Sequence, residues 1–177
     1  WPHFYQSGIN FFADGNNPAG EGNKFFNAGG VVSWDWLIGL IEFPASSTVG
    51  ESHFPLTANE NEVYFNVMVQ GDADLFNSFF IMRFREDDNG DGTWQGGSED
   101  MWSTPEITVD WDGWRLVSIP YSEMFTVTGG EGAAGNHVPN TDRILSVEYL
   151  LLADPTSGPT RGNLDYLIWT EGGPLKP

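Results

Sequence analysis

The sequence of 177 residues contains no cysteine, so disulfide bonds, thiol chemistry and cysteine-based metal sites are excluded. Basic residues are also scarce: 7 Lys and Arg stand against 25 Asp and Glu, for a formal net charge of −18. Nucleic-acid binding requires clustered Lys and Arg to neutralise phosphates, and no segment supplies such a cluster. The negative surface also disfavours polyanionic glycans, so we expect a neutral ligand.

Long apolar runs are missing as well. The longest candidate, around Trp36 to Phe43, is interrupted by Gly39 and Glu42. A membrane-spanning helix needs about 20 consecutive apolar residues, so we expect no direct membrane insertion of this domain.

Glycine, proline and aromatic residues are abundant, with 22 Gly, 11 Pro and 15% aromatic side chains. Short strands separated by turns give this composition. Alternating apolar residues predict strands at 62–70 and 79–85, and a further strand is predicted at 31–42. We therefore predict an all-β fold, a two-sheet antiparallel β-sandwich of jelly-roll type, formed by one domain over residues 1–177. Because the chain begins at Trp1 rather than Met, we expect a module excised from a larger protein.

Three segments are similar to known modules: REDDNGDG at 85–92, DWDGWRLVSIPY at 110–121 and LDYLIWTEGGPL at 164–175. Together they resemble carbohydrate-binding modules of galactose-binding jelly-roll type, as in the C-terminal domains of Bacteroidetes surface glycan-binding lipoproteins. The resemblance spans residues 63–175. It implies an extracellular, cell-surface location in an outer-membrane lipoprotein context, a role in polysaccharide uptake, and a structural calcium ion.

The segment from Asp87 to Gly92 also fits the opening of a calcium loop on its own residues. Acidic and amide side chains alternate there, and a glycine permits the sharp turn. Position twelve is Ser98 rather than glutamate, so a later acid must supply the bidentate carboxylate. The alternative is a hairpin turn with incidental surface acids. Crowded carboxylates repel one another without a cation, so we expect calcium. The predicted ligands are Asp87, Asn89, Asp91, Thr93 through its carbonyl, Glu99 and Asp100.

A second cation site is suggested by the resemblance rather than by spacing. It would join Asp165, in the last predicted strand, with Asp14 or Asn17 from the N-terminal loop. The alternative is a solvated aspartate at the end of a strand.

Tryptophans carry the main functional signal, because a pyranose ring packs its C–H face on an indole while its hydroxyls remain free to hydrogen-bond. Trp34 and Trp36 lie two apart and share a strand face, about 7 Å from one another. The alternative places both on the inner face of the sandwich. Trp94 and Trp102 flank the predicted calcium loop in polar sequence, whereas Trp114 is expected in the core. The predicted glycan-binding residues are Trp34, Asp35, Trp36, Trp94 and Trp102.

Catalysis is not expected. A glycosidase needs two carboxylates at a defined separation, but the acids here cluster in turns. The three histidines lie in unrelated contexts, so neither a zinc site nor a Ser/His/Asp triad is indicated. We expect non-catalytic binding of a neutral polysaccharide or oligosaccharide, with a β-glucan such as laminarin favoured, by a monomer within a larger surface protein. The alternatives are a structural or protein-docking module, or a glycanase.

Overall fold

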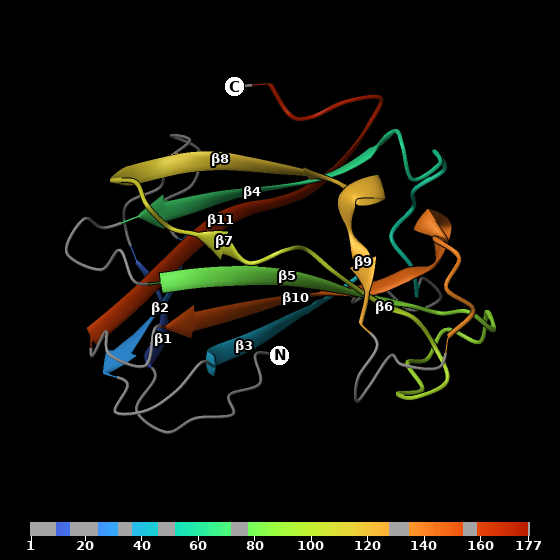
Figure 1. The fold of residues 1–177 in the computed structure, drawn as a ribbon, viewed down its shortest axis with the longest axis horizontal. Helices are drawn as coiled ribbons and strands as arrows, with labels where there is room; N and C mark the ends of the chain where they lie inside the picture. Colours follow the sequence, from blue (N-terminus) through green and yellow to red (C-terminus); the bar gives the residue numbers. More distant parts are fainter. Residues whose placement is uncertain are drawn as a thin grey trace.

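The computed structural model describes residues 10–14, 25–31, 37–45, 52–71, 78–127, 135–153 and 159–176. Two sheets of antiparallel strands form a sandwich, with β8 and β4 of one sheet at the top of the view and β5, β10 and β3 of the other below them (Figure 1). The predicted two-sheet antiparallel β-sandwich is confirmed. None of the helices in the described ranges is long and apolar enough to cross a membrane.

Sheet A has the strand order β1-β2-β11-β4-β8. Its strands are β1 (Asn10–Asp14), β2 (Phe25–Val31), β4 (Val63–Gly71), β8 (Gly113–Pro120) and β11 (Pro159–Glu171). Sheet B has the order β3-β10-β5-β6-β9, and β7 also pairs with β5. Its strands are β3 (Leu37–Pro44), β5 (Ser78–Glu86), β6 (Met101–Ser103), β7 (Ile107–Thr108), β9 (Phe125–Thr126) and β10 (Ile144–Ala153). Two short 3-10 helices, η2 (Tyr121–Glu123) and η3 (Thr141–Arg143), precede β9 and β10.

The core lies between the sheets and follows the period-two pattern of the strands. On β4 the apolar residues Val63, Phe65, Val67 and Val69 are buried, as the alternation predicts. On β5 the buried residues are Phe80, Met82 and Phe84. Phe65 and Phe84 meet edge to face across the sandwich, with ring centroids 5.2 Å apart. This contact joins the two sheets directly.

The predicted single strand at 31–42 is wrong. β2 ends at Val31 in sheet A, and β3 begins at Leu37 in sheet B. The chain therefore changes sheets within the predicted strand. A run of alternating apolar residues has the same appearance whether it stays in one sheet or crosses to the other, so the pattern did not reveal the crossover.

One end of the sandwich carries the acidic loop between β5 and β6. This yellow-green loop and the orange helix η3 lie at the same end of the molecule (Figure 1). Two backbone hydrogen bonds fix the base of the loop: Glu86 N–H donates to the Asp100 carbonyl at 2.9 Å, and Asp87 N–H donates to the Arg143 carbonyl at 3.0 Å. Residues distant in sequence thus meet there.

Candidate functional site

The outer face of sheet B carries a row of residues that crosses β9, β6, β5 and β10. Strand register pairs Phe125 with Ser103, Ser103 with Arg83, Arg83 with Glu148, and Glu148 with Glu42. Directly paired residues of antiparallel strands share one face of a sheet. Because Phe80, Met82 and Phe84 point into the core, Arg83 points outward. The register alone therefore places an aromatic ring, a hydroxyl and a guanidinium side by side.

A pocket of about 360 Å³ opens at the β9 end of this row. We call it the Phe125 pocket. Its lining residues are Ile81, Arg83, Ser103, Thr104, Glu106, Phe125, Thr126 and Val127. Phe125 is 51% exposed, which is unusual for a large apolar side chain, and Arg83 Nε is buried without a hydrogen-bond partner. Ser103 is buried and its hydroxyl donates to the Thr104 carbonyl at 2.9 Å, so Arg83 is the side chain with an unused donor beside the exposed ring. An aromatic ring next to such a donor suits a sugar ring and its hydroxyls.

Trp94, one of the predicted sugar platforms, lies near the same face. The Arg85 guanidinium lies over its ring, 5.3 Å from the ring centroid, in a cation–π contact. Arg85 also forms an ion pair with Glu148, with Nη2 and Oε1 2.5 Å apart. Trp94 is half-buried, so part of its surface remains accessible. A role for Trp94 in glycan binding stays a prediction.

Of the other tryptophans predicted as sugar platforms, the structure describes only Trp102. Trp102 is only 7% exposed and packs on Tyr121 in the core, with ring centroids 5.8 Å apart, so the expectation that it is exposed is wrong. Its place on β6 opposite the inward-facing Phe84 is the physical reason. Trp34, Asp35 and Trp36 lie outside the described residues, and their roles stay predictions.

Trp114, which was expected in the core, is half-buried and pairs with Gln70 on the outer face of sheet A. It meets Phe25 edge to face at 5.2 Å. The apolar strand sequence around Trp114 does not show which face of the sheet it occupies. The expectation of a core position is therefore wrong, and Trp114 is a second aromatic side chain on an outer face.

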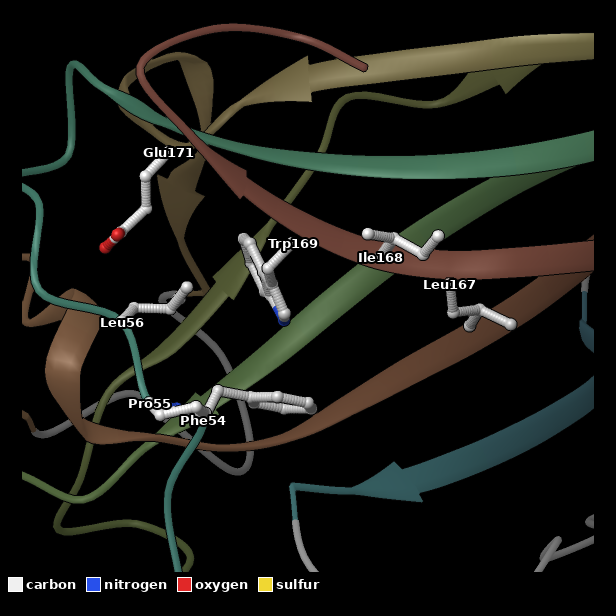
Figure 2. Close-up of a pocket in the computed structure, with 7 residues that line it drawn as sticks. All are labelled: Phe54, Pro55, Leu56, Leu167, Ile168, Trp169 and Glu171. Carbon is white, nitrogen blue, oxygen red and sulfur yellow. The ribbon is translucent and has the colours of Figure 1, made fainter. Parts of the chain in front are cut away.

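A second pocket, of about 460 Å³, lies where the segment before β4 passes the end of β11 (Figure 2). Figure 2 shows the Trp169 indole projecting from β11 toward Phe54. Trp169 Nε1 is buried without a hydrogen-bond partner. The Glu171 carboxylate already accepts hydrogen bonds from the Thr57 and Ala58 N–H groups. Few polar groups are therefore left to bind sugar hydroxyls, and this pocket fits a glycan less well than the Phe125 pocket does.

The acidic loop between β5 and β6 separates its carboxylates into two groups. One oxygen from each of Asp87, Asp91 and Glu99 lies within 4.8 Å of the other two, and the same holds for Glu86, Asp88 and Asp100. Successive residues of an extended chain point in opposite directions, which explains why Glu86 and Asp88 part from Asp87, and Asp100 from Glu99. Asp100, expected as a ligand of the Asp87 group, belongs instead to the other group.

The Asp87 group has the donors that a hard cation prefers. The Asp87 carboxylate is buried and accepts hydrogen bonds from the Gly90, Asp91 and Gly92 N–H groups and pairs with His53 Nε2 at 2.7 Å. Burial acts to raise the pKa of Asp87, but these hydrogen bonds outweigh it and the net shift is downward. Glu99 Oε1 is buried without a partner. Three carboxylates with one unpartnered oxygen fit a calcium ion.

The remaining two predicted ligands take part in the turns of this loop. Asn89 Oδ1 accepts the Asp91 N–H at 2.8 Å, and Asp91 Oδ1 accepts the Thr93 N–H at 2.9 Å. Such side-chain to backbone bonds shape the loop and bring the oxygens of alternate residues together. A ligand role for the Thr93 carbonyl stays a prediction.

The Glu86 group is more deeply buried. Burial raises the pKa of Glu86 from 4.5 to about 7, although hydrogen bonds from Tyr121 and Asn140 oppose the shift. Burial, followed by repulsion from Asp88, raises the pKa of Asp100. These three carboxylates were not predicted as one site. The sequence signal for this second group is the alternation of Glu86, Asp87 and Asp88 at the end of a strand.

The register also bears on the second cation site suggested by the resemblance. Asp14 pairs with Phe25 on β2, and β2 in turn pairs with β11. Asp14 and Asp165 are therefore separated by β2, at about 10 Å from two strand spacings. Asn17 lies outside the described residues. This site stays a prediction.

Comparisons with known proteins bear on the fold. No protein-family model matches the sequence, and no curated protein matches it. A family 11 carbohydrate-binding module from Clostridium thermocellum, solved in complex with a β-1,3-1,4-mixed-linked tetrasaccharide, is 14% identical. The match covers 97% of this chain and 88% of that chain, with a TM-score of 0.58. A family 30 module of a cellulosomal cellulase from the same organism is 12% identical over 97% and 90% of the two chains, with a TM-score of 0.56.

At these identities the likeness concerns the fold. The chain has the β-sandwich fold of these carbohydrate-binding modules, which confirms the predicted jelly-roll architecture and the structural side of the sequence resemblance. The match extends over nearly the whole chain, including the N-terminal third, for which the sequence showed no resemblance.

Proposed function

We propose that the chain is a non-catalytic carbohydrate-binding module that binds a neutral β-glucan at the Phe125 pocket and the adjoining outer face of sheet B. The observation that carries the proposal is Phe125, an exposed aromatic ring in register with Ser103 and Arg83. The ring offers an apolar surface for one sugar face, and Arg83, whose Nε has no hydrogen-bond partner, offers a donor to its hydroxyls.

The fold likeness supports the ligand class. The family 11 module was solved with a β-1,3-1,4-linked glucan oligosaccharide. Ser103 and Glu148 in the row are buried, so the accessible part of this face is the Phe125 pocket. Laminarin, a β-glucan, and mixed-linkage glucan are therefore the first ligands to test.

Charge supports a neutral rather than an anionic glycan. Arg83 and Arg85 are two of only 7 basic residues in a chain with 25 acids. Glu148 pairs with Arg85, and Glu106 lines the Phe125 pocket beside Arg83. The local positive charge is thus offset, while the net charge of −18 repels polyanions at longer range.

We also propose a structural calcium ion in the Asp87 group, with Asp87, Asp91 and Glu99 as carboxylate ligands. The ion would hold the loop between β5 and β6. The chain would act as a monomeric part of a larger cell-surface protein, in an outer-membrane context, that captures polysaccharide for uptake. These points rest on the sequence resemblance and on the carboxylates that the loop brings together.

Affinity electrophoresis tests the glycan proposal. The chain is run through native gels that contain laminarin, mixed-linkage β-1,3-1,4-glucan or an anionic polysaccharide. We expect retardation by a neutral β-glucan, and we expect Phe125→Ala to weaken it at least about tenfold, which corresponds to about 1.4 kcal/mol. Trp114→Ala is the matched control, since it removes an aromatic ring from the outer face of the opposite sheet.

Each outcome decides a different part of the proposal. If no neutral polysaccharide retards the chain, glycan binding is wrong. If Trp114→Ala abolishes retardation and Phe125→Ala does not, the glycan binds sheet A rather than the Phe125 pocket. Trp94→Ala shows whether the site extends along sheet B to the loop end.

A further inference from the structure

Trp94 lies in the acidic loop that follows β5, and its ring is held by a side chain from the end of that strand. The Arg85 guanidinium lies over the indole, 5.3 Å from the ring centroid. Arg85 is the penultimate residue of β5, which ends at Glu86. A planar guanidinium stacks on an aromatic face, which fixes the ring against it. One face of the Trp94 indole is therefore occupied by a residue of sheet B.

The Arg85 guanidinium is held in turn by Glu148 on β10. Arg85 Nη2 lies 2.5 Å from Glu148 Oε1, and the two side chains are only 13% and 3% exposed. Strand register places Glu148 directly opposite Arg83, so its ion pair with Arg85 is diagonal. Arg83 lines the Phe125 pocket instead. Because a charge-assisted hydrogen bond is short and directional, Glu148 fixes the guanidinium on which Trp94 lies.

The backbone on either side of Trp94 is also fixed. Thr93 N–H donates to Asp91 Oδ1 at 2.9 Å, and Gln95 N–H donates to Glu99 Oε2 at 2.6 Å. Trp94 is half-buried, whereas Thr93 and Gln95 are exposed. A ring that is already ordered in an exposed loop loses little conformational entropy when a ligand packs on it. Trp94 is thus preorganised for a ligand on the part of its surface that remains accessible.

The Phe125 pocket lies at the same end of β5 as Trp94. β6 pairs with β5 from Arg83 to Arg85, and β9 pairs with β6, so Phe125 is two strands from β5. Figure 1 shows β9 and β6 at the end of β5 from which the acidic loop leaves. Two strand spacings are about 10 Å, and the step from Arg83 to Arg85 adds about 7 Å along the strand. A chain of several sugars, rather than a single ring, is needed to contact both Phe125 and Trp94.

We propose that Trp94, positioned by Arg85 and Glu148, is a second sugar-stacking platform for the glycan chain that occupies the Phe125 pocket, and that the domain therefore selects long chains over short ones. The inference rests on the proposed glycan binding at the Phe125 pocket. The sugar packs on the indole face opposite the guanidinium, so Arg85 and Glu148 act through Trp94 as positioning residues. Two contacts on one chain strengthen binding only when the chain is long enough to reach both.

Isothermal titration calorimetry with trisaccharides and hexasaccharides of laminarin and of mixed-linkage β-1,3-1,4-glucan tests the inference. We expect the wild type to bind a hexasaccharide at least about tenfold more tightly than the trisaccharide of the same glucan. Trp94→Ala should remove most of this difference by weakening the hexasaccharide, with the trisaccharide affinity unchanged. Trp114→Ala, on the outer face of the opposite sheet, is the matched control and should leave both affinities unchanged.

Arg85→Lys tests the positioning role. Lysine keeps a positive charge beside the buried Glu148 but has no planar group to lie flat on the indole. We expect this variant to weaken hexasaccharide binding severalfold, and to have no further effect when Trp94 is already alanine, because its effect passes through Trp94. If Arg85 only stabilised the fold, Arg85→Lys would weaken trisaccharide and hexasaccharide alike in both backgrounds. Glu148→Gln is the second variant should Arg85→Lys not fold, and circular dichroism checks the folding of each.

The outcomes separate this inference from the function on which it rests. A wild type that binds no glucan oligosaccharide or polysaccharide overturns both. If the wild type binds glucan and a folded Trp94→Ala variant binds the hexasaccharide equally tightly, only the second platform is wrong, and the Phe125 pocket is the whole site. Loss of both oligosaccharides in Phe125→Ala, with only the hexasaccharide weakened in Trp94→Ala, supports two contacts on one chain.

Discussion

Gly135 approaches Asp100 so closely that a Cβ on this glycine would lie 2.0 Å from Asp100 Oδ1 and 2.5 Å from the Asp100 backbone nitrogen. Rotation can move the carboxylate, but the Asp100 backbone nitrogen is held at the base of the acidic loop, where it donates to Asp88 Oδ2 at 3.0 Å. Only glycine lets the segment that contains Asn136 and His137 reach the Glu86 group. Glycine at position 135 is therefore needed for this segment to contact the Glu86, Asp88 and Asp100 carboxylates.

Gly135→Ala is expected to push this segment away from Asp100. The steric conflict and the lost hydrogen bond from His137 N–H should lower the free energy of unfolding by roughly 1–3 kcal/mol. Denaturant unfolding measures the change. Val138→Ala, in the same segment at a side chain that is 55% exposed, is the control and should stay within about 0.5 kcal/mol of the wild type. Equal stability of both variants would contradict the steric argument.

Trp102→Ala is expected to affect stability rather than glycan binding. Trp102 is buried against Tyr121, and truncation of a buried aromatic ring costs about 3–5 kcal/mol. Chemical denaturation measures the loss, and affinity electrophoresis of the fraction that remains folded measures binding. Phe125→Ala should show the reverse, with binding lost and stability nearly unchanged. A Trp102→Ala variant that is fully stable but does not bind glycan would restore Trp102 as a sugar platform.

Trp102 and Phe125 show which parts of the fold could be predicted from the sequence. On β4, nine residues of alternating pattern predicted both the strand and its buried face. β6 has three residues and β9 has two, which is too short for any periodicity to show. Trp102 was therefore judged from its polar neighbours and Phe125 was missed. Trp102 is placed by its register against β5 and Phe125 by its register against β6, and no local pattern records either long-range contact.

The acidic loop was predicted in part for a similar reason. Its composition indicated a cation, and three of the six expected ligands do converge at Asp87, Asp91 and Glu99. The expected set was drawn from linear spacing, which ignores that Glu99 and Asp100 point to opposite sides of an extended chain. The partners that distinguish the Glu86 group, from Tyr121 to Asn140, come from other parts of the chain.

The stability contributed by Glu171 is expected to depend on pH. Hydrogen bonds from the Thr57 N–H and then the Ala58 N–H lower the pKa of this exposed carboxyl below its ordinary value of 4.5. A group whose folded pKa is depressed stabilises the fold above its unfolded pKa, and that contribution disappears as the pH falls through the folded value. Glu171→Gln should therefore melt at a lower temperature than the wild type at pH 7, and the difference should shrink below about pH 4.

Thermal unfolding of both proteins between pH 3 and pH 7 measures this dependence. Glu123→Gln, an exposed acid on η2, controls for the loss of one negative charge from a strongly acidic chain. The interpretation fails if Glu171→Gln and the wild type differ by the same amount at every pH, because neutralisation of the carboxylate would then have no part in the effect.

Removal of calcium is expected to lower the melting temperature. A ligand that binds only the folded state stabilises it by about 2.7 kcal/mol when its concentration is 100 times the Kd. For a domain of this size, each kcal/mol changes the melting temperature by roughly 2–4 °C, so EDTA should lower it by about 5–10 °C. Asp91→Asn should lose much of this response, because it removes one of the three carboxylates of the Asp87 group. Melting curves that superimpose with Ca²⁺ and with EDTA would show that the Asp87 group holds no stabilising ion.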